Sequence, residues 1–235
     1  QDANGDNDPT TSDGVFVYMG NTPVTAAVGD LVRVTGTVVE YTPTGAARSF
    51  TEIKDTTQIL VQSSGHTVTP ANVASLESLA AVEGMLVNFT GALTINQASY
   101  LGERGELTLS VGRRETPTNR HPAGSAGALA MAAANATNLI VLDDSVFTTP
   151  TVIPYIGEGS TVRVGDTVTG LTGVIDFGAI GGGGAAFKVQ PTLAPQISRS
   201  NVRDLAPTLA AGNVRVASAN VLNYFTIYTN GKDIN

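Results

Sequence analysis

The chain has 235 residues, of which 42% are hydrophobic and 14% are charged, so it is expected to fold rather than to be disordered along its length. It contains no cysteine, which excludes a disulfide scaffold and a thiolate metal site. Its 20 Asp and Glu residues outnumber its 13 Lys and Arg residues, and the net charge of −7 argues against tight electrostatic capture of nucleic acid by the chain as a whole.

The residue usage predicts an all-β, mainly antiparallel fold with one or two short helices. Glycine and proline, with 26 and 11 residues, favour many short strands joined by turns. No run reaches the ~18 apolar residues that indicate a membrane span. Residues 1–13 are polar and acidic, and we expect them to form a solvated loop.

Residues 14–83 are predicted to form a first β module. A short apolar run is followed by a Gly-Asp turn, and residues 31–41 then alternate between apolar and polar side chains as a strand does. Residues 50–61 predict the next strand. Residues 71–82 carry apolar side chains at helical spacing, which indicates a short helix that closes the module or links it to the next one.

Residues 84–193 are predicted to form a second β module with an alanine-rich helical insertion between residues 122 and 136. The glycine run at residues 181–184 is expected to be a hairpin tip. Apolar runs predict the strands of this module at residues 85–95, 106–111, 139–142, 162–177 and 187–189.

Two segments of the chain resemble each other. Residues 28–38 begin Val-Gly-Asp and continue as a Val/Thr-rich run, and residues 164–174 repeat this order. The resemblance indicates that the second module is of the same kind as the first. The alternative is that Gly-Asp is a common turn before any strand.

The last part of the chain changes character. Residues 194–213 are polar and contain proline, as a linker does, whereas residues 214–225 are apolar enough for a new buried strand. The ten residues that follow Phe225 are too few to complete a sheet. We therefore expect residues 214–235 to be the beginning of a truncated domain.

Several of these segments, in this order, resemble the bacterial extracellular nucleases of the ExeM/NucH type. The strongest is Val-Ala-Ser-Ala-Asn-Val-Leu-Asn-Tyr-Phe at residues 216–225, which is similar to the first strand of the family's endonuclease/exonuclease/phosphatase domain. The supporting segments are residues 8–17, 28–36, 105–110 and 164–173. The resemblance implies that the two modules are OB-fold-like β-barrels that precede a catalytic domain.

The resemblance also implies a function. In this family the residue that matches Asn220 helps to hold the divalent metal, Mg²⁺ or Ca²⁺, and the scissile phosphate; the alternative is an Asn that caps a turn at the sheet end. The remaining metal ligand and the Asp/His pair that activates water are expected downstream. The chain would thus be the non-catalytic accessory region of a secreted, metal-dependent, sugar-non-specific endonuclease acting on DNA or RNA, and it would be inactive alone.

Two further clusters are candidate sites. Side-chain oxygens at every second position resemble half of a calcium loop without its closing Glu, and the alternative is a flexible acidic terminus; these residues are Asp2, Asn4, Asp6 and Asp8. Cations beside an aromatic suit a groove for single-stranded nucleic acid, and the alternative is a solvated loop whose arginines pair with Glu103, Glu106 and Glu115; these residues are Tyr100, Arg104, Arg113, Arg114 and Arg120.

A second class of function is also compatible with the sequence. Val/Thr/Gly-rich β modules at a bacterial cell surface can assemble with copies of themselves through exposed strand edges, or can bind polysaccharide. The acidity of the chain and the short segment at its end keep this alternative open.

Overall fold

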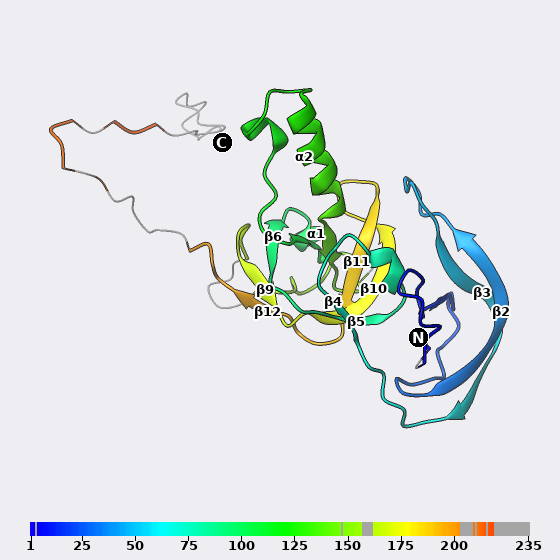
Figure 1. Ribbon diagram of the computed structural model, residues 1–235. Helices are drawn as coiled ribbons and strands as arrows, with labels where there is room; N and C mark the ends of the chain where they lie inside the picture. Colours follow the sequence, from blue (N-terminus) through cyan, green and yellow to red (C-terminus); the bar gives the residue numbers. More distant parts are fainter. Residues whose placement is uncertain are drawn as a thin grey trace, which may run out of the picture. The chain divides into compact units, whose positions relative to one another are not determined.

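The computed structural model describes residues 1–2, 4–146, 148–156, 162–202, 209, 211–214 and 216–218. The chain divides into one compact unit, Gln1–Val202, and a second unit, Arg203–Asn235. The strands and helices described below all belong to the first unit (Figure 1). Strands dominate and helices are few, so the expected all-β class is confirmed.

A small sheet holds three strands in the order β1-β3-β2, formed by β1 (Phe16–Val17), β2 (Leu31–Tyr41) and β3 (Phe50–Ser63). β2 and β3 are antiparallel, and β1 runs parallel to the start of β3. The strands predicted at residues 31–41 and 50–61 are confirmed, because period-two patterns are local and need no knowledge of the partner strand.

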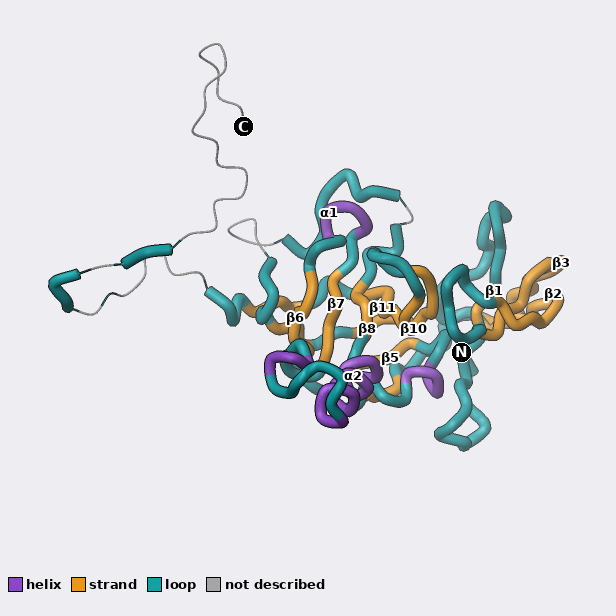
Figure 2. Tube along the Cα trace, turned by 90° about the horizontal axis from the view of Figure 1, so that it is seen from above, coloured by secondary structure: helices purple, strands orange, loops and turns teal. Residues whose placement is uncertain are grey.

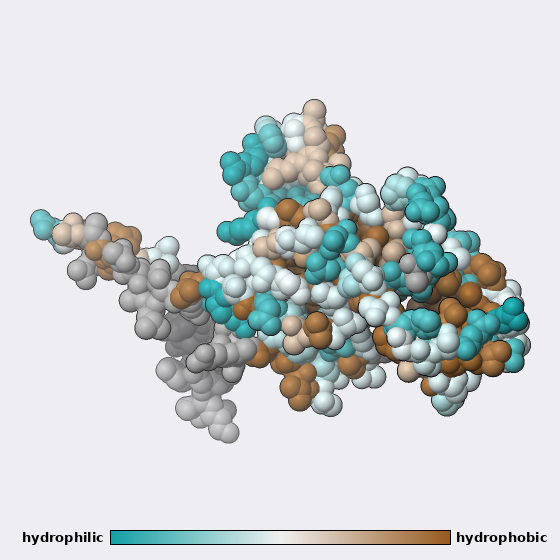
Figure 3. Space-filling model, turned by 60° about the horizontal axis from the view of Figure 1, so that its bottom comes forward, coloured by the Kyte–Doolittle hydropathy of each residue, from teal (hydrophilic) through white to brown (hydrophobic). Residues whose placement is uncertain are grey.

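The β2–β3 pair is a long ribbon with little burial. Leu31 is 52% exposed and Val38 is 67% exposed, although both are apolar residues in a strand. Figure 3 shows apolar side chains mixed with hydrophilic ones at the right, where this ribbon lies. In the described residues β2 pairs only with β3, so its other edge is free along all 11 residues.

A large mixed sheet of nine strands curves into a half-barrel (Figures 1 and 2). Its strand order is β12-β9-β6-β7-β8-β11-β10-β5-β4, and only the pairs β4–β5 and β8–β11 are parallel. Its strands are β4 (Ala71–Val73), β5 (Leu86–Phe89), β6 (Leu93–Gln97), β7 (Leu107–Ser110), β8 (Ile140–Leu142), β9 (Thr167–Thr169), β10 (Thr172–Ala179), β11 (Ala185–Pro191) and β12 (Gln196–Ser198).

The helices are short apart from one. They are η1 (Leu79–Val82), α1 (Leu101–Arg104), η2 (Pro117–Asn119) and α2 (Ala126–Thr137). The predicted alanine-rich helix is α2, which begins where the Ser125 hydroxyl accepts a hydrogen bond from the Ala128 backbone N–H. Figure 2 shows α2 outside the strands. Within the described part of the chain, no helix has both the length and the apolar character needed to cross a membrane.

The helix predicted over residues 71–82 is wrong. Residues 71–73 form strand β4, and only residues 79–82 are helical, as a single 3₁₀ turn. The apolar residues that suggested helical spacing, Val73, Leu76 and Leu79, are buried in the core of the large sheet. A short strand and a turn can therefore bury the same three positions as a helix would.

The change between sheets falls between Ser63 and Ala71, before the expected boundary at residues 83 and 84. β4 pairs with β5, so the end of the predicted first module belongs to the large sheet. Residues 14–83, all of them described, thus contribute three strands to the small sheet and one to the large sheet. The strands of residues 14–83 therefore do not form one five-stranded barrel by themselves.

The two resembling segments form the same turn in different sheets. The Asp30 carboxylate accepts from the Ala27 N–H at 2.8 Å, and the Asp166 carboxylate accepts from the Arg163 N–H at 2.8 Å. The glycine before each Asp has a positive φ, 91° at position 29 and 96° at position 165. The strand after the first turn pairs with β3, and the strand after the second pairs with β6 and β12, so the turn recurs but the pairing does not.

Candidate functional site

Asn220, the residue that the resemblance assigns to metal and phosphate, lies outside the described residues. Of the strand predicted over residues 214–225, the structure describes residues 214 and 216–218, to which it assigns no strand. Val214 is 80% exposed and Val216 is 93% exposed.

The acidic side chains near the N-terminus mainly bind the backbone of their own loop. The Asp2 carboxylate accepts from the Asn4 N–H at 2.9 Å, and the Asp6 carboxylate accepts from the Asp8 N–H at 2.8 Å. The Asp8 carboxylate accepts from both the N–H and the hydroxyl of Thr10. Over the described residues, no group of three or more His, Asp or Glu side chains is arranged to hold a metal ion.

Of the five residues of the predicted nucleic-acid groove, two lie before β7 in the chain and three lie after it. Arg104 precedes β7, whereas Arg113 and Arg114 follow it, so the chain places them beyond opposite ends of that strand. The Arg120 guanidinium donates two hydrogen bonds to Glu115, at 2.6 and 2.9 Å. Arg104 pairs with Glu106 at 3.4 Å, as the ion-pair alternative expected.

Two further members of the predicted groove, Arg114 and Tyr100, are partly buried, whereas Arg113 is exposed. Burial lowers the pKa of the Arg114 guanidinium. The backbone N–H of Arg114 donates to the side-chain carbonyl oxygen of Asn96. The ring of Tyr100 lies directly against the backbone of Gly181 and Gly182, so a Cβ at either glycine would overlap it. That face of Tyr100 is therefore not free to stack on a base.

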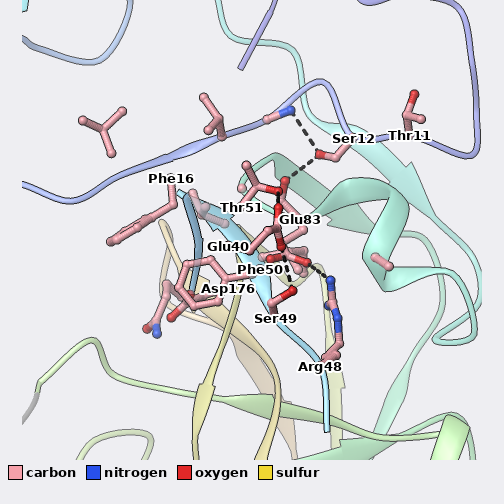
Figure 4. Close-up of a pocket in the computed structure, with 18 of the residues that line it drawn as sticks. Thr11, Ser12, Phe16, Glu40, Arg48, Ser49, Phe50, Thr51, Glu83 and Asp176 are labelled. Carbon is pink, nitrogen blue, oxygen red and sulfur yellow. Dashed lines mark hydrogen bonds and ion pairs between the residues drawn. The ribbon is translucent and has the colours of Figure 1, made fainter. Parts of the chain in front are cut away.

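A cleft that the sequence did not indicate lies between the small sheet and β10. Its cavity has a volume of about 670 Å³. We call it the inter-sheet cleft and show it in Figure 4; its lining includes Ser12, Phe16, Glu40, Arg48, Ser49, Phe50, Thr51, Glu83 and Asp176. A second cavity of about 200 Å³ shares Ser145, Asp176 and Gln190 with it.

One wall of the inter-sheet cleft carries a hydroxyl–carboxylate network. Glu40, near the end of β2, accepts hydrogen bonds from the Ser49 and Thr51 hydroxyls, each at 2.6 Å. These bonds lower the pKa of the Glu40 carboxyl, with Ser49 making the larger contribution. The antiparallel register explains the contact, because Glu40 and Thr51 lie opposite each other on adjacent strands.

Arg48 joins the small sheet to the large one. Its guanidinium donates to the Glu83 carboxylate at 2.6 Å and lies 4.8 Å from the ring centres of both Phe177 and Phe187. Burial raises the pKa of Glu83, and the contact with Arg48 offsets only part of that effect. Figure 4 shows Arg48 on the side of the cleft away from Phe16.

A buried ion-pair cluster lies at the second cavity. The Lys188 ammonium, on β11, contacts Asp143 at 2.7 Å and Glu106 at 3.2 Å, and all three side chains are buried. The other oxygen of Glu106 accepts from the Gly181 N–H at 2.6 Å, which holds the tip of the β10–β11 hairpin. This cluster ties together three segments that are far apart in sequence.

Ser63 and His66 form a further polar contact, with 2.7 Å between the hydroxyl and Nε2. Both side chains are exposed, and neither lines the two cavities. The cavities are instead lined by carboxylates, hydroxyls, an amide, two aromatic rings and the cations of Arg48, Arg104 and Lys188, together with apolar side chains, and such a mixture is typical of ligand-binding sites.

The fold and this lining define an all-β protein with a cleft of mixed polar and apolar lining between two sheets. The chain belongs to the family described as "Domain of unknown function (DUF8508)", whose model matches residues 41–201. That range includes β3, the whole large sheet and most of the inter-sheet cleft. No curated protein and no solved structure matches the chain.

Proposed function

We propose that this chain is the non-catalytic N-terminal accessory region of a secreted, divalent-metal-dependent, sugar-non-specific endonuclease, and that it positions DNA or RNA for a catalytic domain that begins near Val214. The observation that carries the proposal is the segment at residues 216–225, which resembles the first strand of the endonuclease/exonuclease/phosphatase domain. The order of the preceding segments supports it.

Asn220 has the chemistry that the proposal requires. A carboxamide has both a donor and an acceptor. Its NH₂ group can orient a phosphate oxygen while its carbonyl oxygen faces Mg²⁺ or Ca²⁺. Phosphodiester hydrolysis also needs an activated water and stabilised phosphoryl charge. In the proposed enzyme these groups come from the sequence after residue 235.

The test compares two proteins. One is the 235-residue chain, and the other is the same chain extended through the sequence encoded after it. With Mg²⁺ or Ca²⁺, the extended protein is expected to cut plasmid DNA and a structured RNA, and the 235-residue chain is expected to cut neither. Cleavage by the short chain alone would contradict the assigned roles.

A point variant of the extended protein tests the residue. Asn220→Ala is expected to lower kcat by about 100-fold or more, because a group that orients the metal and phosphate acts in the transition state. Asn213→Ala, outside the resembling segment, is the matched control and should leave kcat unchanged. Two results would contradict the proposal: an extended protein that cleaves no nucleic acid with either metal, and an Asn220→Ala variant with full activity.

The free edge of β2 favours a second candidate function, self-association at a cell surface. An 11-residue edge strand with unpaired backbone groups is a template for another strand. Sedimentation should then detect a dimer or larger species that Val38→Lys dissociates. Val152→Lys, at another exposed valine outside the strands of the small sheet, is the control. A monomer at all concentrations would exclude this function.

A further inference from the structure

We propose that the inter-sheet cleft binds a neutral saccharide. Its cavity of about 670 Å³ falls within the range of small-molecule sites, and its lining combines hydrogen-bonding side chains with the aromatic rings of Phe16 and Phe50. The proposal uses only described residues between Thr10 and Gln190, so it goes beyond the nuclease proposal and does not depend on it.

The polar groups of the cleft match a ligand that both donates and accepts. Ser49 and Thr51 donate their hydroxyl protons to Glu40, which leaves their oxygens free to accept from a ligand. Asp176 accepts from the Phe177 N–H through one oxygen, and its second oxygen has no partner among the described residues. Because each hydroxyl of a sugar ring can both donate and accept a hydrogen bond, neighbouring sugar hydroxyls can bind to these side chains.

The charges of the cleft disfavour an anion. Its lining holds three carboxylates, Glu40, Glu83 and Asp176, against the single guanidinium of Arg48. That guanidinium is paired with Glu83 and lies over two phenylalanine rings, and its Nη1 is buried without a hydrogen-bond partner among the described residues. A phosphate group would therefore meet excess negative charge and no free cation.

The same contacts favour a neutral ligand over a cation. The Glu83 charge is paired with Arg48, and each oxygen of Glu40 already accepts a hydroxyl. Only Asp176 remains without a donor from another side chain among the described residues. The walls of the cleft carry more hydroxyl groups than unpaired carboxylates. These hydroxyl groups belong to Thr10, Thr11, Ser12, Ser49 and Thr51, among others.

Phe16 supplies an exposed aromatic ring to the site. Its ring is 45% exposed and lines the cleft, and its edge-to-face contact with Phe50, at 6.1 Å between ring centres, fixes its orientation. The face of an aromatic ring is electron-rich and can cover the C–H face of a sugar. The second cavity, which shares Asp176 and Gln190 with the cleft, offers room for part of a neighbouring sugar unit.

The experiment is saturation-transfer NMR with the full 235-residue chain and defined probes: glucose, mannose, galactose, N-acetylglucosamine and cellobiose. At least one of these sugars is expected to bind, whereas AMP and spermidine are the anionic and cationic comparisons. Because the assay contains neither nucleic acid nor a divalent metal, its result is independent of whether the extended protein is a nuclease.

Two variants locate the binding. Phe16→Ala and Asp176→Asn are each expected to raise Kd by about tenfold, the loss that corresponds to one aromatic contact or one hydrogen bond to a charged group. Tyr18→Ala, an exposed aromatic outside the cleft, and Asp55→Asn, an exposed carboxylate on β3, are the matched controls and should leave Kd within about twofold.

Each outcome decides the proposal. Sugar binding that is weakened by the cleft variants and not by the controls supports it. The absence of binding by all five sugars overturns it, as does sugar binding that the cleft variants leave intact. Displacement of a bound sugar by spermidine would assign the cleft to cations instead and would also overturn it.

Discussion

The Arg48 guanidinium donates to the Glu83 carboxylate at 2.6 Å, across the interface between the small sheet and the large one. The two residues are 35 positions apart in the chain and line the same cleft. Nη1 of Arg48 and Oε1 of Glu83 are buried without hydrogen-bond partners in the described part of the chain. The pair therefore depends on a single short contact and on the two phenylalanine rings beneath Arg48.

Replacing Arg48 by alanine is expected to destabilise the protein by about 1–3 kcal/mol, because it leaves the Glu83 carboxylate in a poorly solvated position without its donor. The free energy of unfolding in urea measures the loss. Arg33→Ala is the control: Arg33 is exposed on β2, and its removal should change stability by less than about 0.5 kcal/mol. Equal effects of the two substitutions would contradict the role of Arg48.

The raised pKa of Glu83 predicts a pH dependence with a definite sign. Burial makes the folded protein bind this proton more tightly than the unfolded chain does, whose carboxyl has the ordinary value of 4.5. The contribution of Glu83 to stability is thus greatest at low pH and declines as pH rises through the folded pKa. Glu83→Gln removes this titration.

The measurement is the free energy of unfolding of the wild type minus that of Glu83→Gln, from about pH 4 to about pH 8. Taking the difference cancels the opposite trend of carboxylates with lowered pKa, such as Glu40, which lose their contribution as pH falls. The difference should decrease toward high pH. A difference that grows with pH would show that the Arg48 pairing outweighs burial.

Lys188→Met is expected to destabilise the protein by about 3–5 kcal/mol, because it leaves the buried carboxylates of Glu106 and Asp143 without their shared cation. Adding Glu106→Gln and Asp143→Asn to this variant neutralises both carboxylates and should recover most of the loss. Urea denaturation of the single and triple variants gives both numbers. If the triple variant is no more stable than the single one, the loss is not electrostatic.

Gly181→Ala should cost about 1–3 kcal/mol, because the added Cβ overlaps the ring of Tyr100. Gly178→Ala, in β10 of the same hairpin, is the matched control, since no atom lies within 4 Å of its Cβ position. Thermal unfolding compares the two. A Gly178→Ala variant as unstable as Gly181→Ala would point to hairpin geometry rather than to the contact with Tyr100.

Local patterns in the sequence predicted the elements well where one strand or helix carries its own signal. The alternation over residues 31–41, the alanine-rich run at α2 and the glycines of the β10–β11 turn each lie where the structure has the corresponding element. Residues 71–82 were misjudged because the spacing of Val73, Leu76 and Leu79 reports which positions are buried and not which backbone buries them.

The two cavities could not be predicted from the sequence because each brings together side chains from segments far apart in the chain, such as Arg48 and Glu83 across 35 positions. Lys188 reaches Glu106 and Asp143 across 82 and 45 positions, and no local pattern links them. The arginines were more conspicuous in the sequence, yet Arg104 and Arg120 pair with nearby glutamates as the solvated-loop alternative expected. Clustered charge in a sequence thus indicated local ion pairs, whereas the inter-sheet contacts had no counterpart in it.

The strand order of the large sheet has a consequence for how the chain acquires its fold during synthesis. β5 pairs with β4 and β10, and β6 pairs with β7 and β9, so each of these two strands gains its second partner only when residues 167–179 have been made. At ribosomal rates, their partners emerge on the order of 5–15 s later. Until then the apolar residues of β5 and β6 are only partly covered, so the core of the large sheet is completed late in synthesis.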